Sequence, residues 1–411
     1  MDLKKKVLLN SSQLFGGQFL HSIISYAIVL MIGRTFGTEG LGQYSFIIAF
    51  TAFVAYIADF GIEYYLLREI AKDNQNYDLI SKSFGIKVFL GILCWFLIVF
   101  LTIFINKDPL VKLAIIIYGL ASICSSIGLL FKSIIHANMV SKYESISILT
   151  ERILTLIVGG VLLYFTKNLF LFMVVLTLDI FILNILRYNY ASKYAKIRLK
   201  FNLKDGINIL KKSYFFWFIY VFSFIYYNTD ILMLGIMQSD SSVGIYRGGY
   251  FFIQAAMIIP VVVISTVMPS ISILHTENRE LLKTLFKKAF IFLSFLGISL
   301  NLVLFIGSQS FIGLFFGNEF VESILVLQIM SFSIISIFLN SLYGSLLNAT
   351  GNEKKYAKVL GFSAILNVCL NFLLIPSMSY AGVAVSTLIS NWVVTVILMF
   401  SCGRVINLKR L

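Results

Sequence analysis

The sequence predicts an all-α membrane protein with twelve transmembrane helices. Apolar residues make up 59% of the 411 positions and charged residues only 13%. The apolar residues gather in long runs, such as 89–105 and 115–130. With their small polar neighbours, these runs reach the roughly 20 residues that an α-helix needs to cross a bilayer. Because backbone groups in hydrocarbon must bond within their own segment, we expect each run to be a helix.

The runs and the basic residues together predict the topology. Spans are expected at roughly 13–36, 42–62, 83–105, 111–136, 144–165, 168–189, 213–237, 243–273, 283–306, 321–348, 356–376 and 381–404. Of the 33 Lys and Arg residues, 28 then fall on the side of the N-terminus. The other side keeps Arg34, Lys107, Lys112, Lys167 and Arg247. Basic loops stay in the cytoplasm, so both termini are predicted to be cytoplasmic.

The longest loop predicts a division into two halves. Residues 190–212 are rich in Lys and Arg and lie at the midpoint of the chain. We expect this segment to be a cytoplasmic connector on anionic headgroups. It joins an N-terminal six-helix bundle, 1–189, to a C-terminal one, 213–411.

An internal repeat supports the two halves. When residues 26–44 are placed over 228–246, five of nineteen positions are identical, among them Gly42 with Gly244 and Tyr44 with Tyr246. The offset is close to half the chain and aligns the first helix of each half in the same orientation. Parallel repeats of this kind occur in one class of transporters.

Several function classes are excluded or disfavoured. The loops do not exceed about 25 residues, which leaves no room for a soluble catalytic domain. The chain has no phosphate-binding G-x-x-x-x-G-K-[ST] motif, and its four cysteines show no metal-ligand spacing. We expect no cofactor and no metal. The net charge of +14 resides in short loops between spans, so nucleic acid is not expected as a partner.

Ionisable residues inside spans are costly and are candidates for function. Asp59, Glu151 and Asp179 are candidate ion-coupling residues, although a structural ion-pair cluster is an equal alternative for Glu151 and Asp179. Lys87 and Lys132 lie near span ends and are expected to extend toward the headgroups. Pro260 is expected to kink its helix, and Pro376 to end one.

Two polar stripes mark the first helix of each half. The residues recur at helical spacing and are Gln18, His21, Ser22 and Ser25, then Ser223, Tyr226, Tyr227 and Asp230. They either bond neighbouring helices or line a water-filled cavity between the halves. Tyrosine beside a carboxylate suits a sugar, whereas Arg34 and Arg247 suit a phosphate. The candidate substrate-binding residues are Arg34, Asp230, Arg247, Tyr226, Tyr227, His21 and Ser25.

The chain resembles the bacterial polysaccharide exporters, or O-antigen (oligosaccharide-lipid) flippases, over nearly its whole length. They belong to the multidrug/oligosaccharidyl-lipid/polysaccharide exporter superfamily. The motifs that carry the resemblance are Gly33-Arg34, Gly40-Leu41-Gly42-Gln43-Tyr44, Asn228 to Gly235, Val243 to Arg247, Asn348 to Gly351, Asn367 to Pro376, and Ala381 to Ala384. The family often has Gly-Ala-Ala where this chain has Gly382-Val383-Ala384.

The resemblance implies two six-helix bundles in a V shape with a cavity lined by spans 13–36, 42–62, 213–237 and 243–273. It implies a short oligosaccharide on undecaprenyl diphosphate as substrate, turned from the cytoplasmic to the outer leaflet of the bacterial cytoplasmic membrane by alternating access. Membrane lipids, a polysaccharide polymerase and a chain-length regulator are the partners it implies. O-antigen and capsule repeat units are both compatible with it.

Two other functions remain open. A cation- or proton-coupled small-molecule antiporter of the same superfamily would use a carboxylate in the N-terminal half. A membrane-embedded enzyme of polysaccharide synthesis would need a large outer loop or an Asp-x-Asp motif, and the chain has neither. We therefore do not expect an enzyme.

The predicted topology can be tested with reporter fusions. We expect fusions at Asn106, Lys167 and Ser239 to report the outer side, and fusions at Asn74, Lys200 and Asn352 the cytoplasmic side. Alkaline phosphatase and a fluorescent protein, each active on one side only, provide the readout. A single inverted pair would refute the map, because one missed span inverts every later loop.

Overall fold

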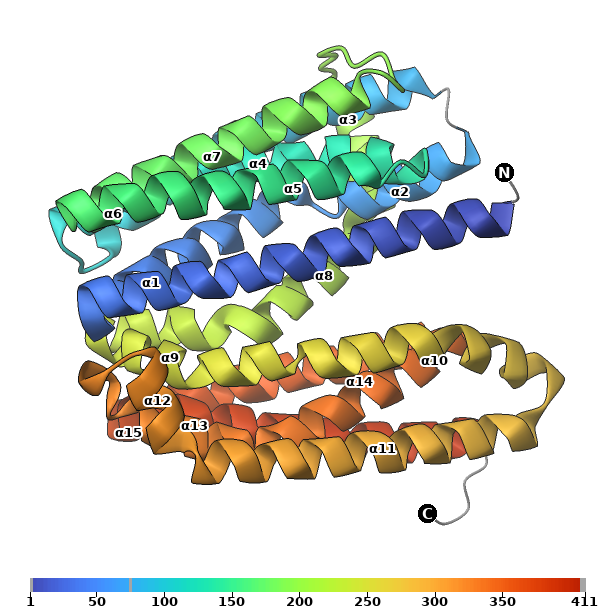
Figure 1. The fold of residues 1–411 in the computed structure, drawn as a ribbon. Helices are drawn as coiled ribbons and strands as arrows, with labels where there is room; N and C mark the ends of the chain where they lie inside the picture. Colours follow the sequence, from blue (N-terminus) through green and yellow to red (C-terminus); the bar gives the residue numbers. More distant parts are fainter. Residues whose placement is uncertain (1–2, 74–75, 407–411) are drawn as a thin grey trace. The chain divides into compact units, whose positions relative to one another are not determined.

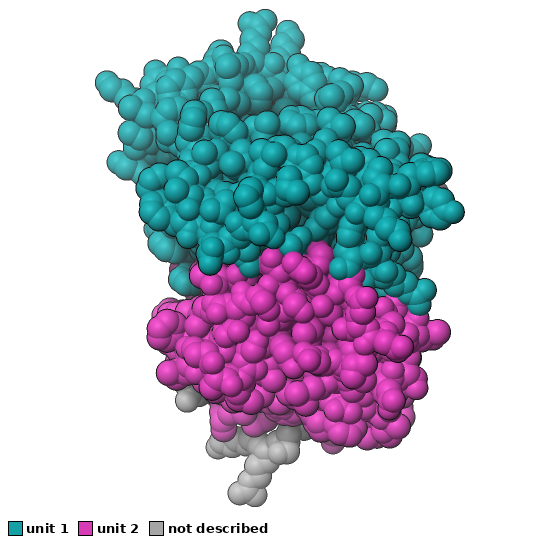
Figure 2. Space-filling model, turned by 90° about the vertical axis from the view of Figure 1, so that its left-hand side faces the viewer, with its two compact units in different colours: residues 1–36, 43–224 teal, residues 37–42, 225–411 magenta. Residues whose placement is uncertain are grey.

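The computed structural model describes residues 3–73 and 76–406, and every regular element in that part of the chain is a helix (Figure 1). Two compact units are present, coloured separately in Figure 2. Unit 1 contains residues 1–36 and 43–224, and unit 2 contains residues 37–42 and 225–411. The division falls inside one long helix, α8 (Leu203–Met237), about a dozen residues beyond the predicted connector.

Unit 1 is built around one central helix. Its elements are most of α1 (Leu3–Asp59), α2 (Ile62–Lys72), α3 (Tyr77–Phe104), α4 (Pro109–Ala137), α5 (Lys142–Leu154), the π-helical turn η1 (Thr155–Gly159), α6 (Gly160–Thr166), α7 (Leu169–Ala191) and the first part of α8. Helix α4 packs against α2, α3 and α7. Its residues Leu130 and Ile134 are fully buried in a hydrophobic core with Ile80 of α3.

Unit 2 contains the rest of the helices. They are α9 (Asp240–Ala256), α10 (Ile258–Glu277), α11 (Arg279–Ile306), α12 (Ser308–Phe315), the 3₁₀ turn η2 (Asn318–Phe320), α13 (Ser323–Ser331), α14 (Ser333–Ala349) and α15 (Glu353–Ile406). Helix α14 packs against α10, α11 and α15, and α13 packs against α9 and α15. The large apolar side chains at the surface are those expected of helices that face lipid.

The helices have the length and composition of membrane spans. Among the described residues, eight helices are long and apolar enough to cross a membrane, and α13 with α14, bent by 45°, would make a ninth. Both α1 and α15 contain a non-helical residue, Gly37 at φ 65° and Ser379 at φ 49°. Each of these long elements is therefore two helices joined at a sharp turn.

The two prolines behave differently from each other. The predicted interruption at Pro260 is confirmed, since α9 ends at Ala256 and α10 begins at Ile258. Pro260 has no N–H to donate to the carbonyl of Ala256, four residues earlier. The prediction that Pro376 ends its helix is wrong, because the chain stays helical as far as the break at Ser379.

Two glycines of the repeat lie very close to backbone carbonyls within unit 2. A Cβ atom on Gly42 would lie 1.8 Å from the carbonyl oxygen of Asp240, and one on Gly244 would lie 1.8 Å from that of Thr38. Thr38 also shares a 2.8 Å hydrogen bond with Ser241. The contact is reciprocal. The shift that places residues 26–44 over 228–246 also places Gly42 over Gly244 and Thr38 over Asp240. Small residues permit such close helix crossings in membranes.

We expect Gly42→Ala and Gly244→Ala to destabilise the protein by about 1–3 kcal/mol each, because the added methyl group collides with a backbone carbonyl that cannot move aside. Thermal unfolding of the detergent-purified variants measures the effect. Gly361→Ala is the control, since nothing lies within 4 Å of its Cβ position on α15. Equal melting temperatures for all three variants would contradict the close crossing.

Candidate functional site

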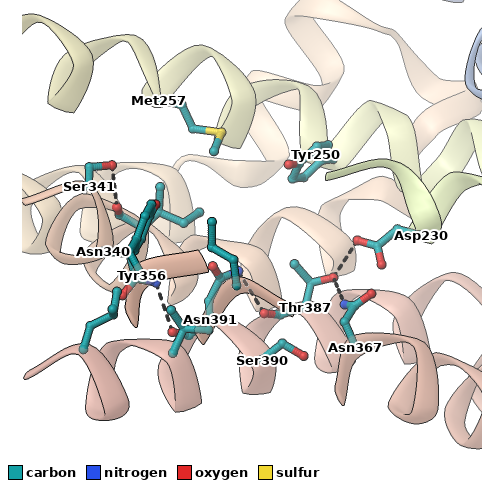
Figure 3. Close-up of a pocket in the computed structure, with 14 residues that line it drawn as sticks. Asp230, Tyr250, Met257, Asn340, Ser341, Tyr356, Asn367, Thr387, Ser390 and Asn391 are labelled. Atoms are coloured by element: carbon teal, nitrogen blue, oxygen red, sulfur yellow. Dashed lines mark hydrogen bonds between the residues drawn. The ribbon is translucent and has the colours of Figure 1, made fainter. Parts of the chain in front are cut away.

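Asp230 is a buried carboxylate held by three neutral donors. It lies in the part of α8 that belongs to unit 2 and is only 5% exposed. The Tyr246 hydroxyl donates to its Oδ2 at 2.8 Å, and the Thr387 hydroxyl donates to the same oxygen at 2.7 Å. The Asn371 amide donates to Oδ1 at 2.8 Å. The site thus joins α8, α9 and α15 (Figure 3).

The local sequence explains how α15 reaches this carboxylate. Asn367 and Asn371 lie one turn apart on its first arm, and the Asn371 amide also donates to Asn367 Oδ1 at 3.1 Å. Thr387 lies on the second arm, beyond the break at Ser379. Both arms therefore present polar side chains to Asp230. Fixing each of these side chains removes rotamer freedom, so the site is pre-formed.

A cavity of about 60 Å³ opens beside Asp230, within unit 2 (Figure 3). Its lining residues are Asp230, Tyr250, Met257, Ile337, Asn340, Ser341, Tyr356, Leu360, Asn367, Thr387, Ser390, Asn391, Val394 and Leu398. Amides and hydroxyls dominate the wall next to the carboxylate. A cavity of this size, with polar groups on one wall, holds several water-sized molecules.

The geometry limits what Asp230 can do chemically. None of its hydrogen-bond partners carries a positive charge. An ionised carboxylate inside an apolar helical unit is costly unless water, a cation or donors compensate it. The site can therefore hold a proton or a small cation, or accept hydroxyl donors from a sugar. In the described part of the chain, no group of three or more His, Cys, Asp or Glu residues is placed to bind a metal ion.

Asp230 forms no ion pair with Arg247 in the described part of the chain, and the neighbouring residue Tyr246 donates to its carboxylate. Arg247 is half-buried on α9 and makes no ion pair with any described residue. Arg34 is exposed on α1, three residues before the break at Gly37. The side chains of Ser223, Tyr226 and Tyr227 lie outside the described residues, although their backbone is part of α8.

The polar stripe at the start of unit 1 is tied into helix contacts. The Arg152 Nε donates to His21 Nε2 at 2.8 Å and lies 3.3 Å from Glu151 Oε2. The Ser25 hydroxyl donates to the carbonyl of His21 in its own helix at 2.8 Å. His21 thus joins α1 to α5, and the hydroxyl of Ser25 is satisfied within its helix.

The remaining acids of this region are also bonded. The Thr155 hydroxyl, in the π-helical turn η1, donates to Asp179 Oδ2 at 2.7 Å. Glu144 forms a buried ion pair with Arg187. Glu151, Asp179 and Glu144 are each less than 5% exposed. This region of unit 1 is therefore a network in which two arginines face three carboxylates.

A second group of charges lies near the junction of α1 and α2. Asp59 forms an ion pair with Lys87, and both side chains are almost completely buried. The expectation that Lys87 extends to the headgroups is therefore wrong, since its ammonium group on α3 forms this buried ion pair with the carboxylate of Asp59 on α1. Lys132 pairs with Glu63 at 2.8 Å while keeping 24% of its side chain exposed. Tyr220 of α8 donates to the other oxygen of Glu63 at 2.7 Å.

Sequence reasoning found Asp230 but missed its partners. Asn367 and Asn371 were present in a stretch that carried the family resemblance, and their i, i+4 spacing in an apolar span was the available signal. Tyr246 and Thr387 gave no such signal. Their partner lies 16 and 157 residues away along the chain.

Comparison with protein families identifies the chain. The family described as "Polysaccharide biosynthesis protein" matches residues 7–275, more than half of its length. The chain belongs to this family. This match confirms the resemblance to polysaccharide exporters found in the sequence. Family membership and the spans make it a multi-pass membrane protein of polysaccharide biosynthesis.

Two named relatives match over nearly the whole chain, and a third matches less than half of it. The capsular polysaccharide biosynthesis protein CapF of Staphylococcus aureus is 25% identical over 93% of this chain and 96% of its own length. The probable low-salt glycan biosynthesis flippase Agl15 of Haloferax volcanii is 23% identical over 100% of this chain and 85% of its own. A putative O-antigen transporter of Escherichia coli is 28% identical over 42% of this chain and 43% of its own.

Solved structures share the fold. The lipid II flippase MurJ in an inward closed conformation has a TM-score of 0.77 at 16% identity, covering 96% of this chain and 87% of its own. An inward-facing multidrug resistance MATE family transporter has a TM-score of 0.75 at 12% identity, covering 95% of each chain.

The Asp59–Lys87 pair allows a test of whether Asp59 has a structural role or an ion-coupling role. We expect Lys87→Ala to destabilise the protein by about 3–5 kcal/mol, because it leaves a buried carboxylate without its cation. The double variant Asp59→Asn with Lys87→Met should recover most of the folded yield, measured by detergent size-exclusion chromatography. A double variant that is folded but inactive would instead assign Asp59 to ion coupling.

Proposed function

We propose that this protein is a flippase for a lipid-linked glycan. Its substrate is a short oligosaccharide on undecaprenyl diphosphate, an O-antigen or capsule repeat unit, moved from the cytoplasmic to the outer leaflet of the bacterial cytoplasmic membrane by alternating access. The observation that carries the proposal is the full-length similarity to relatives named as a glycan biosynthesis flippase and a capsular polysaccharide biosynthesis protein. The protein moves its substrate without chemical change and needs no catalytic residue.

The physical chemistry of the substrate favours the same function. A diphosphate with several sugar hydroxyls is strongly hydrated, and transferring it into hydrocarbon without partners costs many kcal/mol. Interior polar groups of the kind found around Asp230 and Arg152 lower such a barrier, since they replace hydration at membrane depth. An apolar lipid tail needs no such help and can remain in the bilayer.

We propose that the twelve predicted spans form two six-helix bundles, with both termini in the cytoplasm. Counting the two arms of α1 and of α15 separately, and adding α8 as a span, brings the nine apolar spans to twelve. The excess of Lys and Arg in alternate loops supports the orientation.

Roles for the site residues follow from chemistry. We assign Asp230 to sugar orientation or to exchange of a proton or cation, because its hydrogen-bond partners among the described residues are all neutral. Arg34 and Arg247 are assigned to the diphosphate or to an anionic sugar, because guanidinium binds phosphate oxygens in a fixed fork. Tyr226, Tyr227, His21 and Ser25 are kept as candidate sugar contacts, and Asp179 and Glu151 as candidate coupling groups.

Asp230→Asn tests the assigned charge. Asparagine keeps the shape and the ability to accept from Thr387 and Tyr246, so we expect normal membrane abundance with at least about tenfold lower flipping. Flipping is measured as outer-leaflet exposure of lipid-linked oligosaccharide in a deletion strain. Full activity of this variant would refute a role for the charge, and loss of abundance would make Asp230 structural.

Arg34 and Arg247 are tested by paired substitutions. Lysine keeps the charge but loses the planar fork, so Arg→Lys should lower polysaccharide export partly, and Arg→Ala should remove most of it. Surface polysaccharide is compared at matched protein level. Lys112→Ala, another basic residue predicted on the outer side, is the control. Complementation by both Ala variants at the level of this control would reject the anion-binding role.

A further inference from the structure

The segment between α7 and α8 is fixed to the body of unit 1. Residues 192–202 are not helical, and the backbone N–H of Lys200 donates to the carbonyl of Ser81 at 3.4 Å. Gly85 of α3 allows this contact, because a Cβ there would lie 2.1 Å from the carbonyl oxygen of Lys200. Lys200 also pairs with Asp78 at 2.8 Å, and Asp205 with Lys82 at 3.1 Å. The segment is therefore held against the first turns of α3.

Its exposed side chains form an unusual pattern. From 196 to 201 the sequence alternates basic and apolar residues one by one. The apolar side chains are not hidden, since Leu199 is 63%, Phe201 51% and Leu203 55% exposed. The basic side chains that are exposed and make no ion pair with any described residue are Lys196, Arg198, Lys204, Lys211 and Lys212. We call residues 196–212 the connector surface.

The position of the connector surface decides what can cover it. It follows α7, a helix apolar enough to span a membrane, and extends over the first turns of α8, whose later turns are apolar. A segment at the end of a spanning helix lies at the level of the lipid headgroups. There, exposed apolar side chains reach the acyl boundary, and basic side chains meet phosphate groups. Each Lys or Arg near an anionic surface strengthens the attraction.

We propose that the connector surface binds anionic phospholipids of the surrounding bilayer, with Leu199, Phe201 and Leu203 inserted between the acyl chains and the basic side chains on the headgroup phosphates. Charge complementarity selects acidic over zwitterionic lipid. Exposed apolar residues next to the basic ones select a bilayer surface over a soluble acidic partner, which would leave Leu199 and Phe201 in water. The site serves as a lipid anchor for unit 1, whatever the chain transports.

Native mass spectrometry of the full-length protein in neutral detergent tests the proposal. Dioleoyl phosphatidylglycerol, dioleoyl phosphatidylcholine and undecaprenyl phosphate are titrated separately as probes. The charge variant is Lys196→Gln, Arg198→Gln and Lys204→Gln together. Its matched control is Lys354→Gln, Lys355→Gln and Lys358→Gln, which removes the same charge from exposed positions on α15. Melting temperature and elution profile verify that each variant is folded.

We expect the wild-type protein to prefer phosphatidylglycerol, the charge variant to lose about a hundredfold in its apparent affinity, and the control to change less than about twofold. Leu199→Ser with Phe201→Ser keeps every charge and should also weaken binding, because the apolar contribution is lost. Equal losses in charge variant and control would overturn the proposal, as would equal binding of the two lipids. Binding of undecaprenyl phosphate but not phosphatidylglycerol at this surface would also overturn it and assign the surface to the carrier lipid.

Discussion

A carboxylate inside an apolar helical unit needs a partner, and this constraint organises the interior of both units. In unit 1 the partners are mostly cations, and each pair fixes two helices against each other. The pairs are Asp59 with Lys87, Glu63 with Lys132, and Glu144 with Arg187. In unit 2 Asp230 has only neutral donors. The paired acids of unit 1 are neutralised by their neighbouring cations, whereas the described partners of Asp230 supply hydrogen bonds and no opposite charge.

The contrast between the units is notable because the sequence contains a repeat. The repeat includes the place where two backbones meet. Gly42 lies against the carbonyl of Asp240, and Gly244 lies against the carbonyl of Thr38. Such reciprocal contacts are typical of a local two-fold relation, in which the same patch is used twice. Geometry at this crossing is therefore shared between the halves, while the polar chemistry inside the units differs.

The sequence predicted what depends on local properties. Apolar length and Pro260 were sufficient to place helices and one interruption, because backbone bonding in hydrocarbon leaves few alternatives. Asp230 was found because a charge in an apolar span is costly wherever it points. Its partners could not be found, since Asn371 lies 141 residues away and only tertiary packing brings it close. Lys87 shows the same limit. Its ammonium group could reach the headgroups or pair with a buried acid, and the position of a residue in the sequence does not tell which of the two occurs.

The π-helical turn Thr155–Gly159 has a consequence for how this protein is compared with others. A π-turn accommodates one residue more than an α-helical turn, so the residues that follow are rotated by about 100° relative to a regular helix. In a relative whose helix is regular at this point, the equivalent of α6 begins one residue earlier. A correct alignment then needs a single-residue gap inside a membrane span. An alignment without that gap assigns every residue from Gly160 to Thr166 to the wrong face and the wrong neighbours.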